Sequence, residues 1–141
     1  MRIAKEFTWE MGHRLPFHEG KCKNLHGHSY KMMVELDGEP DNNGMVLDYY
    51  DVKSMINPLV EELDHACLVF EGDTELQELL QKLNSRMVVV DFHSTAENLV
   101  GYFLKNIKEV GLPANIRKVT VKVLETENTY AEDSLEINSH I

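Results

Sequence analysis

The 141-residue chain lacks several features that mark special classes of protein. It has only two cysteines, Cys22 and Cys67, which are too few for a disulfide scaffold. No apolar run approaches the roughly 20 residues of a membrane-spanning helix, and the first residues lack the apolar block of a signal peptide. Positive charge is scarce, with 14 Lys and Arg against 24 Asp and Glu. We therefore expect a cytoplasmic protein of one domain, residues 1–141, with free thiols and neither a membrane nor a nucleic-acid partner.

The little basic charge that is present lies near the N-terminus. The first 34 residues hold six Lys and Arg against three Asp and Glu, whereas the whole chain carries a formal net charge of −10. Four of the seven histidines lie in the same stretch. This asymmetry is compatible with a site for a small anionic ligand, and equally with an ordinary solvated surface.

Three histidines and one cysteine lie within sixteen residues: His13, Cys22, His26 and His28. If a strand begins at His26, then His26 and His28 share one face of it, because side chains alternate with period two. Residues 2–13 alternate as well and carry His13 on their apolar parity. Two adjacent antiparallel strands would therefore bring three imidazoles to one metal ion.

Three protein nitrogens with an open fourth position are typical of catalytic zinc sites, whereas structural zinc sites are closed by four ligands. Cys22 lies four residues before His26, near enough to act beside such a metal as nucleophile or base. The alternative is that the histidines are surface residues and Cys22 a small core residue. The concentration of these residue types favours the metal site.

Apolar spacing predicts two helices in the middle of the chain. Asp48 is a suitable N-cap for a helix that ends at Leu63, with a kink or break near Asn57 because a proline follows it. A second, short helix follows the capping-box pattern of Thr74 with Gln77.

The second half of the chain predicts further elements. Residues 87–90 are apolar and mostly β-branched, which favours a strand. Ser94 with Glu97 forms another capping-box pattern before a long amphipathic helix that Gly111 ends. Two strands are then predicted: residues 116–127, and a short one around Leu135 and Ile137.

The main elements come in β-β-α-α-β-β order. The economical α+β solution is an antiparallel four-stranded sheet with two main helices on one face. Such a sheet leaves edges and one face that other subunits could cover, so we expect a homo-oligomer.

Several motifs together resemble the 6-pyruvoyltetrahydropterin synthase family, and within it the 6-carboxytetrahydropterin synthase branch. They follow one another in order over nearly the whole chain: His13, C-x3-H-G-H at residues 22–28, Asp64-His65, S-T-A-E-N at residues 94–98, and Glu125-Thr126. The chain departs from many members at Trp9 and Met11, which stand where small residues are usual.

The resemblance implies a tunnelling fold (T-fold), a homohexamer built as two trimers, and a zinc-dependent lyase. The implied reaction converts 7,8-dihydroneopterin triphosphate to 6-carboxy-5,6,7,8-tetrahydropterin, acetaldehyde and triphosphate, in queuosine and 7-deazaguanine biosynthesis. The alternatives are a 6-pyruvoyltetrahydropterin synthase, which releases no acetaldehyde, and a non-catalytic pterin-binding module. A zinc hydrolase is disfavoured, because the sequence has no H-E-x-x-H pattern.

The resemblance also implies roles for individual residues. The zinc ligands would be His13, His26 and His28. Cys22 would act as base or nucleophile, with Asp64 and His65 completing a charge-coupled set around it. Glu125, assisted by Thr95 and Glu97, would anchor the pterin.

Some of these residues have a simpler reading. Asp64 and His65 could merely end a helix, and Glu97 fits a capping box without any ligand. Glu125 shares the parity of a run of valines in its strand, so its carboxylate needs a partner. Cys67 is expected in the core, and the sequence assigns no role to His18 or His93.

Overall fold

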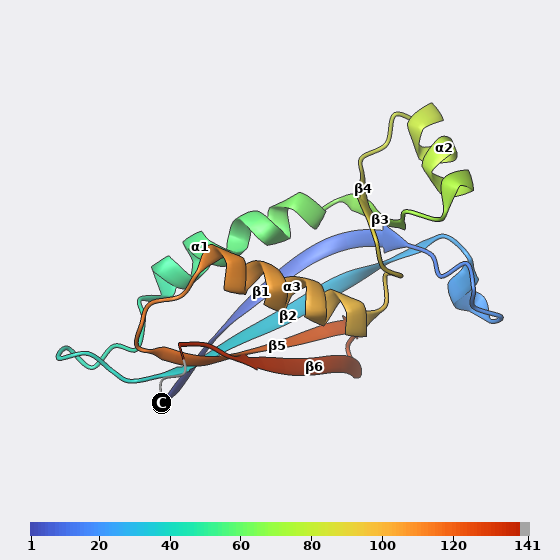
Figure 1. Cartoon of the computed structure of the whole chain (residues 1–141). Coiled ribbons are helices and arrows are strands. Elements are labelled where there is room, and N and C mark those ends of the chain that lie inside the picture. The colour runs from blue at the N-terminus through green and yellow to red at the C-terminus, as the bar shows by residue number, and fades with distance from the viewer. Residues whose placement is uncertain (139–141) are drawn as a thin grey trace.

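The structure is a computed structural model, and it describes residues 1–138. The strands are β1 (Arg2–His13), β2 (His26–Gly38), β3 (Ala66–Phe70), β4 (Met87–Val90), β5 (Ile116–Thr126) and β6 (Thr129–Glu136). The helices are α1 (Tyr49–Leu63), α2 (Thr74–Lys82) and α3 (Ala96–Val110), with a short 3-10 helix at Lys21–Lys23 (Figure 1). No helix among these residues is long and apolar enough to cross a membrane.

The strands form one six-stranded mixed sheet in the order β4-β3-β1-β2-β5-β6. Strands β1, β2, β5 and β6 pair antiparallel, whereas β3 pairs parallel to both β1 and β4. The prediction of a four-stranded antiparallel sheet is therefore wrong, although its four strands are present. The missed strand, β3, is buried almost throughout, so it lacks the alternation that reveals a half-exposed strand.

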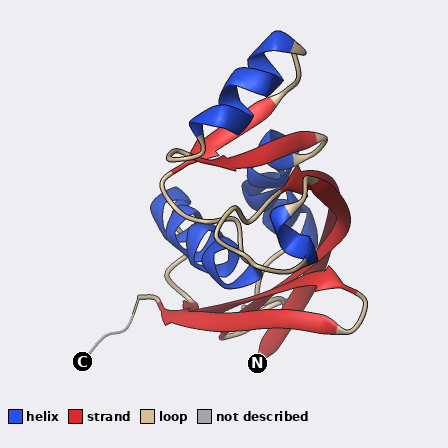
Figure 2. Ribbon diagram, turned by 90° about the vertical axis from the view of Figure 1, so that its right-hand side faces the viewer, coloured by secondary structure: helices blue, strands red, loops and turns tan. Residues whose placement is uncertain are grey.

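Helices α1 and α3 cover one face of the antiparallel strands, as predicted, and α2 lies beyond the end of the sheet beside β3 and β4 (Figures 1 and 2). In the main core the Trp9 ring stacks on Tyr30 at 5.2 Å and meets Phe103 of α3 edge-on at 5.5 Å. Cys67 is buried, as expected, in a smaller cluster under α2. The sheet thus has one covered face, and the histidines continue that face beyond Trp9 and Tyr30.

Helix α1 begins as predicted, because the Asp48 side chain accepts a hydrogen bond from the Tyr50 N–H at 2.8 Å. Of the predicted kink or break near Asn57, the break is wrong, since α1 continues through Pro58 to Leu63. Pro58 lies on the exposed side of the helix, where water can satisfy the carbonyl that loses its partner. The buried face of α1 is therefore not interrupted.

Two predicted caps are displaced by one residue, for reasons that lie outside the helices. Asp73, not Thr74, caps α2, and Thr95, not Ser94, caps α3. Ser94 is buried and turned toward His13 instead. Gly111 ends α3 as predicted, with a φ of 88° that suits glycine.

The last strand, β6, begins at Thr129, earlier than the predicted strand around Leu135 and Ile137. Ile137 follows the strand but packs against the core.

Candidate functional site

The structure brings three histidines together at one end of the sheet. In the register of β1 and β2, His13 stands opposite His26, and Met11 stands opposite His28. One nitrogen of each imidazole lies within 4.8 Å of the others. The glycine between His26 and His28 allows close pairing, because a Cβ on Gly27 would lie 3.2 Å from the Met11 carbonyl oxygen.

Backbone carbonyls orient two of the three rings. His13 Nδ1 donates to the Ser94 carbonyl at 2.9 Å and lies 3.0 Å from Ser94 Oγ. His26 Nδ1 donates to the Asn24 carbonyl at 2.6 Å. A carbonyl can only accept, so the proton sits on Nδ1 and the Nε2 lone pair of each ring is free for a metal.

Burial favours the neutral form, which a metal needs, in two of the three histidines. Burial, together with a smaller effect of the neighbouring His26 and His28, lowers the pKa of His13 to about 4, and the hydrogen bond to the Ser94 carbonyl partly opposes this shift. Burial also lowers the pKa of His28. His13 Nε2 is buried and makes no hydrogen bond within residues 1–138. A buried nitrogen without a partner, in a set of three imidazoles, fits a zinc ion.

Glu125, on β5, lies directly beside this cluster. Its Oε1 is 3.4 Å from His13 Nε2 and 3.7 Å from His28 Nε2. The Glu125 side chain is 27% exposed, and of the three histidines only His13 is buried. Its parity in the strand therefore brings the carboxylate beside the histidine cluster.

Asp64 and His65 form a pair at the junction of α1 and β3. Asp64 Oδ1 accepts hydrogen bonds from His65 Nδ1 and from the Glu10 N–H, both at 2.9 Å. The hydrogen bond from Glu10, more than the one from His65, lowers the pKa of Asp64. The pair is fixed by its backbone, because the His65 N–H donates to the Glu10 carbonyl at 2.7 Å and Arg86 donates to the Asp64 carbonyl at 2.7 Å.

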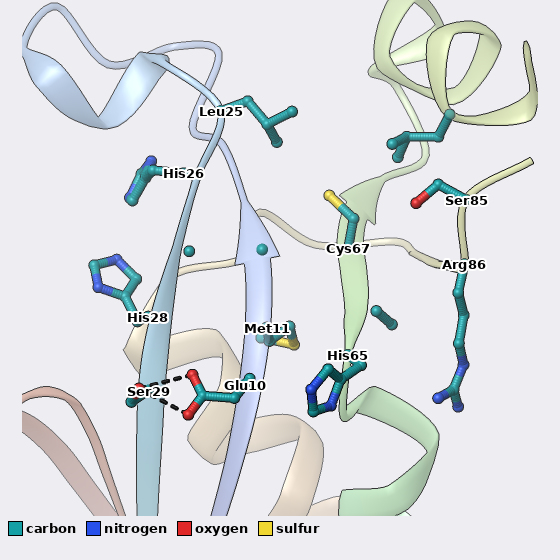
Figure 3. Close-up of a pocket in the computed structure, with 14 residues that line it drawn as sticks. Glu10, Met11, Leu25, His26, His28, Ser29, His65, Cys67, Ser85 and Arg86 are labelled. Carbon is teal, nitrogen blue, oxygen red and sulfur yellow. Dashed lines mark hydrogen bonds between the residues drawn. The ribbon is translucent and has the colours of Figure 1, made fainter. Parts of the chain in front are cut away.

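His65 adopts a φ of 60°, which is unusual for a residue other than glycine and is held by these contacts. Its side chain is 75% exposed. It lines a pocket of about 480 Å³ together with Cys67 and Arg86, and residues of the His26–His28 strand line the other side. In Figure 3 the rings of His26 and His28 project from the side of β2 that faces away from β1, and His65 lies between β1 and β3.

Within one chain, Cys22 does not meet the Asp64–His65 pair. Cys22 lies in the 3-10 helix, half-buried, and does not line this pocket. In the described part of the chain no hydrogen bond or ion pair joins its thiol to Asp64 or His65. The histidine cluster and Glu125 are assembled, whereas Cys22 and the Asp64–His65 pair remain apart.

Of the two residues predicted at the start of α3, Thr95 has a structural role, whereas Glu97 makes no hydrogen bond or ion pair in the described part of the chain. Thr95 Oγ1 accepts from the Asn98 N–H at 3.1 Å as the N-cap, and Glu97 is exposed in the first turn. Sequence reasoning missed Ser94 as the group that orients His13, and Arg86 as the group that holds Asp64. Ser94 was read only as a cap, and nothing in the pattern around Arg86 signals its contacts.

The model of the 6-pyruvoyl tetrahydropterin synthase family matches residues 2–135 of the chain. The 6-carboxy-5,6,7,8-tetrahydropterin synthase of Haemophilus influenzae is 34% identical over 139 residues, which cover 93% of this chain and 96% of that protein. The enzyme of the same name from Aquifex aeolicus is 33% identical over 154 residues, covering 92% and 95%.

Solved structures agree with these matches. A catalytic-residue mutant of the Plasmodium vivax 6-pyruvoyltetrahydropterin synthase has a TM-score of 0.78 at 19% identity, covering 97% of this chain and 98% of that one, which supports the tunnelling fold. The Caenorhabditis elegans 6-pyruvoyl tetrahydropterin synthase has a TM-score of 0.67 at 25% identity, covering 96% and 94%. With matches in sequence and fold over nearly its whole length, the chain belongs to the 6-pyruvoyl tetrahydropterin synthase family of enzymes.

Proposed function

We propose that this enzyme is a zinc-dependent lyase that converts 7,8-dihydroneopterin triphosphate to 6-carboxy-5,6,7,8-tetrahydropterin, acetaldehyde and triphosphate, as a step of queuosine and 7-deazaguanine biosynthesis. The observation that carries the proposal is the set of three imidazoles, two of them oriented by backbone carbonyls, with a carboxylate beside it. The names of the relatives from Haemophilus influenzae and Aquifex aeolicus favour the 6-carboxy branch.

His13, His26 and His28 would hold the zinc ion through their Nε2 atoms. When bound, zinc supplies Lewis acidity toward oxygen atoms of the substrate. Ser94 and Asn24 fix two of the rings before any metal arrives. This preorganisation leaves little side-chain entropy to be lost on binding.

Glu125 would anchor the pterin, assisted by Thr95 and Glu97. The 2-amino-pyrimidinone edge of a pterin presents two N–H groups side by side, which match the two oxygens of a carboxylate. The partial exposure of Glu125 leaves it accessible to such a ligand. Its position beside His13 and His28 would hold the ring next to the metal.

Cys22 would accept the proton that leaves the substrate side chain, as a thiolate. His65 donates from Nδ1 to Asp64, so its Nε2 is free to exchange a proton with Cys22 or the substrate. Cys22 and His65 do not meet in one chain, so we propose a homo-oligomer, a homohexamer of two trimers, in which the Asp64–His65 pair of one copy serves the Cys22 site of another.

The test is to incubate the zinc-loaded protein with 7,8-dihydroneopterin triphosphate and to assay acetaldehyde and the pterin product together. Acetaldehyde with the 6-carboxy product supports the proposal. Triphosphate release without acetaldehyde indicates the pyruvoyl-forming synthase, the activity named for the Caenorhabditis elegans protein. Binding of the pterin without turnover indicates a binding module.

A further inference from the structure

The loop of residues 14–25 joins β1 to β2 and carries Cys22. Leu15 is buried, and its N–H donates to the Cys22 carbonyl at 2.8 Å. The backbone of Cys22 is therefore placed by Leu15. Whatever holds the residues around Leu15 also sets the position of the cysteine.

Arg14 is held from outside the loop by Asp73, the N-cap of α2. Its Nε donates to Asp73 Oδ2 at 2.7 Å and its Nη2 donates to Oδ1 at 2.5 Å. A bidentate contact of this kind fixes direction as well as distance. This contact anchors the start of the loop.

Phe17, which follows Leu15 in the loop, is held by the ring of His93. The His93 ring meets the Phe17 ring edge-on, with centroids 4.7 Å apart, and stacks on Phe70 at 4.1 Å with an interplanar angle of 28°. Phe17 is 58% exposed, so these ring contacts, and not burial in the core, account for its placement. His93 thus lies between the loop and the end of β3.

His93 is also next in the sequence to a residue that contacts the histidine cluster. It precedes Ser94, whose carbonyl accepts from His13 Nδ1. The His93 carbonyl accepts from the Thr95 N–H at 2.8 Å and from the Asn98 side-chain amide at 2.9 Å, which fixes its backbone at the start of α3. One residue therefore contacts the Cys22 loop with its ring and adjoins the group that orients His13.

We propose that His93 is a positioning residue, whose ring between Phe17 and Phe70 holds the Cys22 loop in register with the three-histidine cluster. The proposal rests on the proposed function only in assigning a catalytic role to Cys22. The ring acts through its faces and edge, so an aromatic residue of another kind can replace it. Replacement by phenylalanine therefore distinguishes a positioning role from proton transfer or metal binding by His93, since phenylalanine can do neither.

The experiment compares His93→Ala with His93→Phe in the full-length, zinc-loaded protein. In His93→Ala we expect the Leu15 amide and its neighbours in the loop to exchange hydrogen roughly three- to tenfold faster, because the ring contacts are lost. We expect kcat to fall about 10- to 100-fold through misplacement of Cys22, with a smaller change in KM. His93→Phe should stay within about threefold of the parent in both measurements, because the stack is kept.

Phe17→Ala provides a second variant whose folding is not at risk, since the side chain is largely exposed. It should loosen the loop as His93→Ala does. Glu19→Ala is the matched control, since it removes an exposed side chain of the same loop that makes no hydrogen bond or ion pair in the described part of the chain, whereas the His18 ring accepts from the Gly20 N–H. It should leave exchange and kcat near the parent values.

The proposal is overturned if loop exchange is unchanged in His93→Ala, or if His93→Phe is as defective as His93→Ala. It is also overturned if His93→Ala loses zinc in proportion to activity, since the residue would then act through His13 alone. Should the parent protein not turn over the pterin, the proposed function fails, but the exchange measurements still decide the role of His93.

Discussion

His26 and His28 of the histidine cluster lie on one side of β1 and β2, and His65 lies on the other (Figure 3). The cluster and the Asp64–His65 pair are held in different ways. His13 is 1% exposed, within the register of β1 and β2, and its ring is oriented by Ser94. The His65 side chain is 75% exposed and is positioned by its backbone and by Asp64. The histidine cluster is complete within one chain, whereas the exposed pair is suited to serve a site that lies outside its own chain.

The largest effect should come from breaking the histidine cluster. His28→Ala removes one of three imidazoles, and we expect the protein to lose stoichiometric zinc and, with it, detectable turnover. Metal analysis of the purified protein after dialysis provides the measurement. His18→Ala, which removes a histidine outside the cluster, should keep full zinc. A full complement of zinc in His28→Ala would contradict the three-histidine site.

Substitution of His65 or Cys22 should affect turnover but not zinc content, unlike substitution of His28, since neither residue contacts the histidine cluster within one chain. We expect Cys22→Ala and His65→Ala each to lower kcat by about 10³-fold while zinc content is kept, because proton transfer is lost. Cys67→Ala removes the other thiol and tests whether the loss is specific to Cys22. Near-normal turnover in Cys22→Ala would remove the cysteine from the mechanism.

The two catalytic variants also test whether the site is shared between copies. If Cys22→Ala and His65→Ala chains are dissociated, mixed and reassembled, random pairing gives about a quarter of the sites both intact groups, so activity should return to about that level. Each variant treated alone is the control. A mixture that stays as inactive as its components would show that Cys22 and His65 act within one chain.

A smaller effect should appear in the stability of the metal-free protein. The pKa of His13 is lowered to about 4, from 6.5, by burial. Between these two pH values His13 is protonated in the unfolded chain but not in the folded chain. Its contribution to the free energy of unfolding is therefore complete above pH 6.5 and is lost as the pH falls toward 4. The loss is on the order of 2 to 3 kcal/mol.

Urea unfolding of the metal-free protein at a series of pH values measures this loss. His13→Asn, which has no titrating group at this position, separates the contribution of His13 from that of the carboxylates. The prediction is wrong if the pH dependence of the two proteins is the same between pH 4 and 6.5.

The smallest effect should come from the group that orients His13. Ser94→Ala removes the hydroxyl 3.0 Å from His13 Nδ1 but keeps the carbonyl at 2.9 Å, so the ring retains its main acceptor. We expect zinc affinity to fall by about tenfold or less. Competition with a chelator of known affinity measures it. A loss of zinc affinity comparable to that in His28→Ala would mean that the Ser94 hydroxyl, not its carbonyl, determines the orientation of the His13 ring.

The accuracy of the sequence predictions differs between the same two regions. Alternation in residues 2–13, with Lys5 as the exception, and after His26 predicted both the strands and the common face of the histidines, because a strand with one buried face alternates. The five residues of β3 are buried nearly throughout and gave no such pattern. The prediction therefore missed the strand that sets Asp64 and His65 beside Glu10.

The displaced helix caps have a related cause. Ser94 and Thr95 both suit an N-cap, and sequence spacing with Glu97 favoured Ser94. The structure uses Ser94 for His13, on a strand 81 residues away in the chain, and leaves the cap to Thr95. Spacing within a helix cannot register such a distant partner.

The sequence by itself determined the central strands, the main helices and the gathering of three histidines, since these depend on periods of two and 3.6 residues and on pairing between neighbouring segments. Only the tertiary structure decided the parallel addition of β3 and β4, the contact of Glu125 with the histidines, and the place of His93 between Phe17 and Phe70. These depend on which distant segments pack together, because short-range patterns record whether a side chain is buried but not which residue it is buried against.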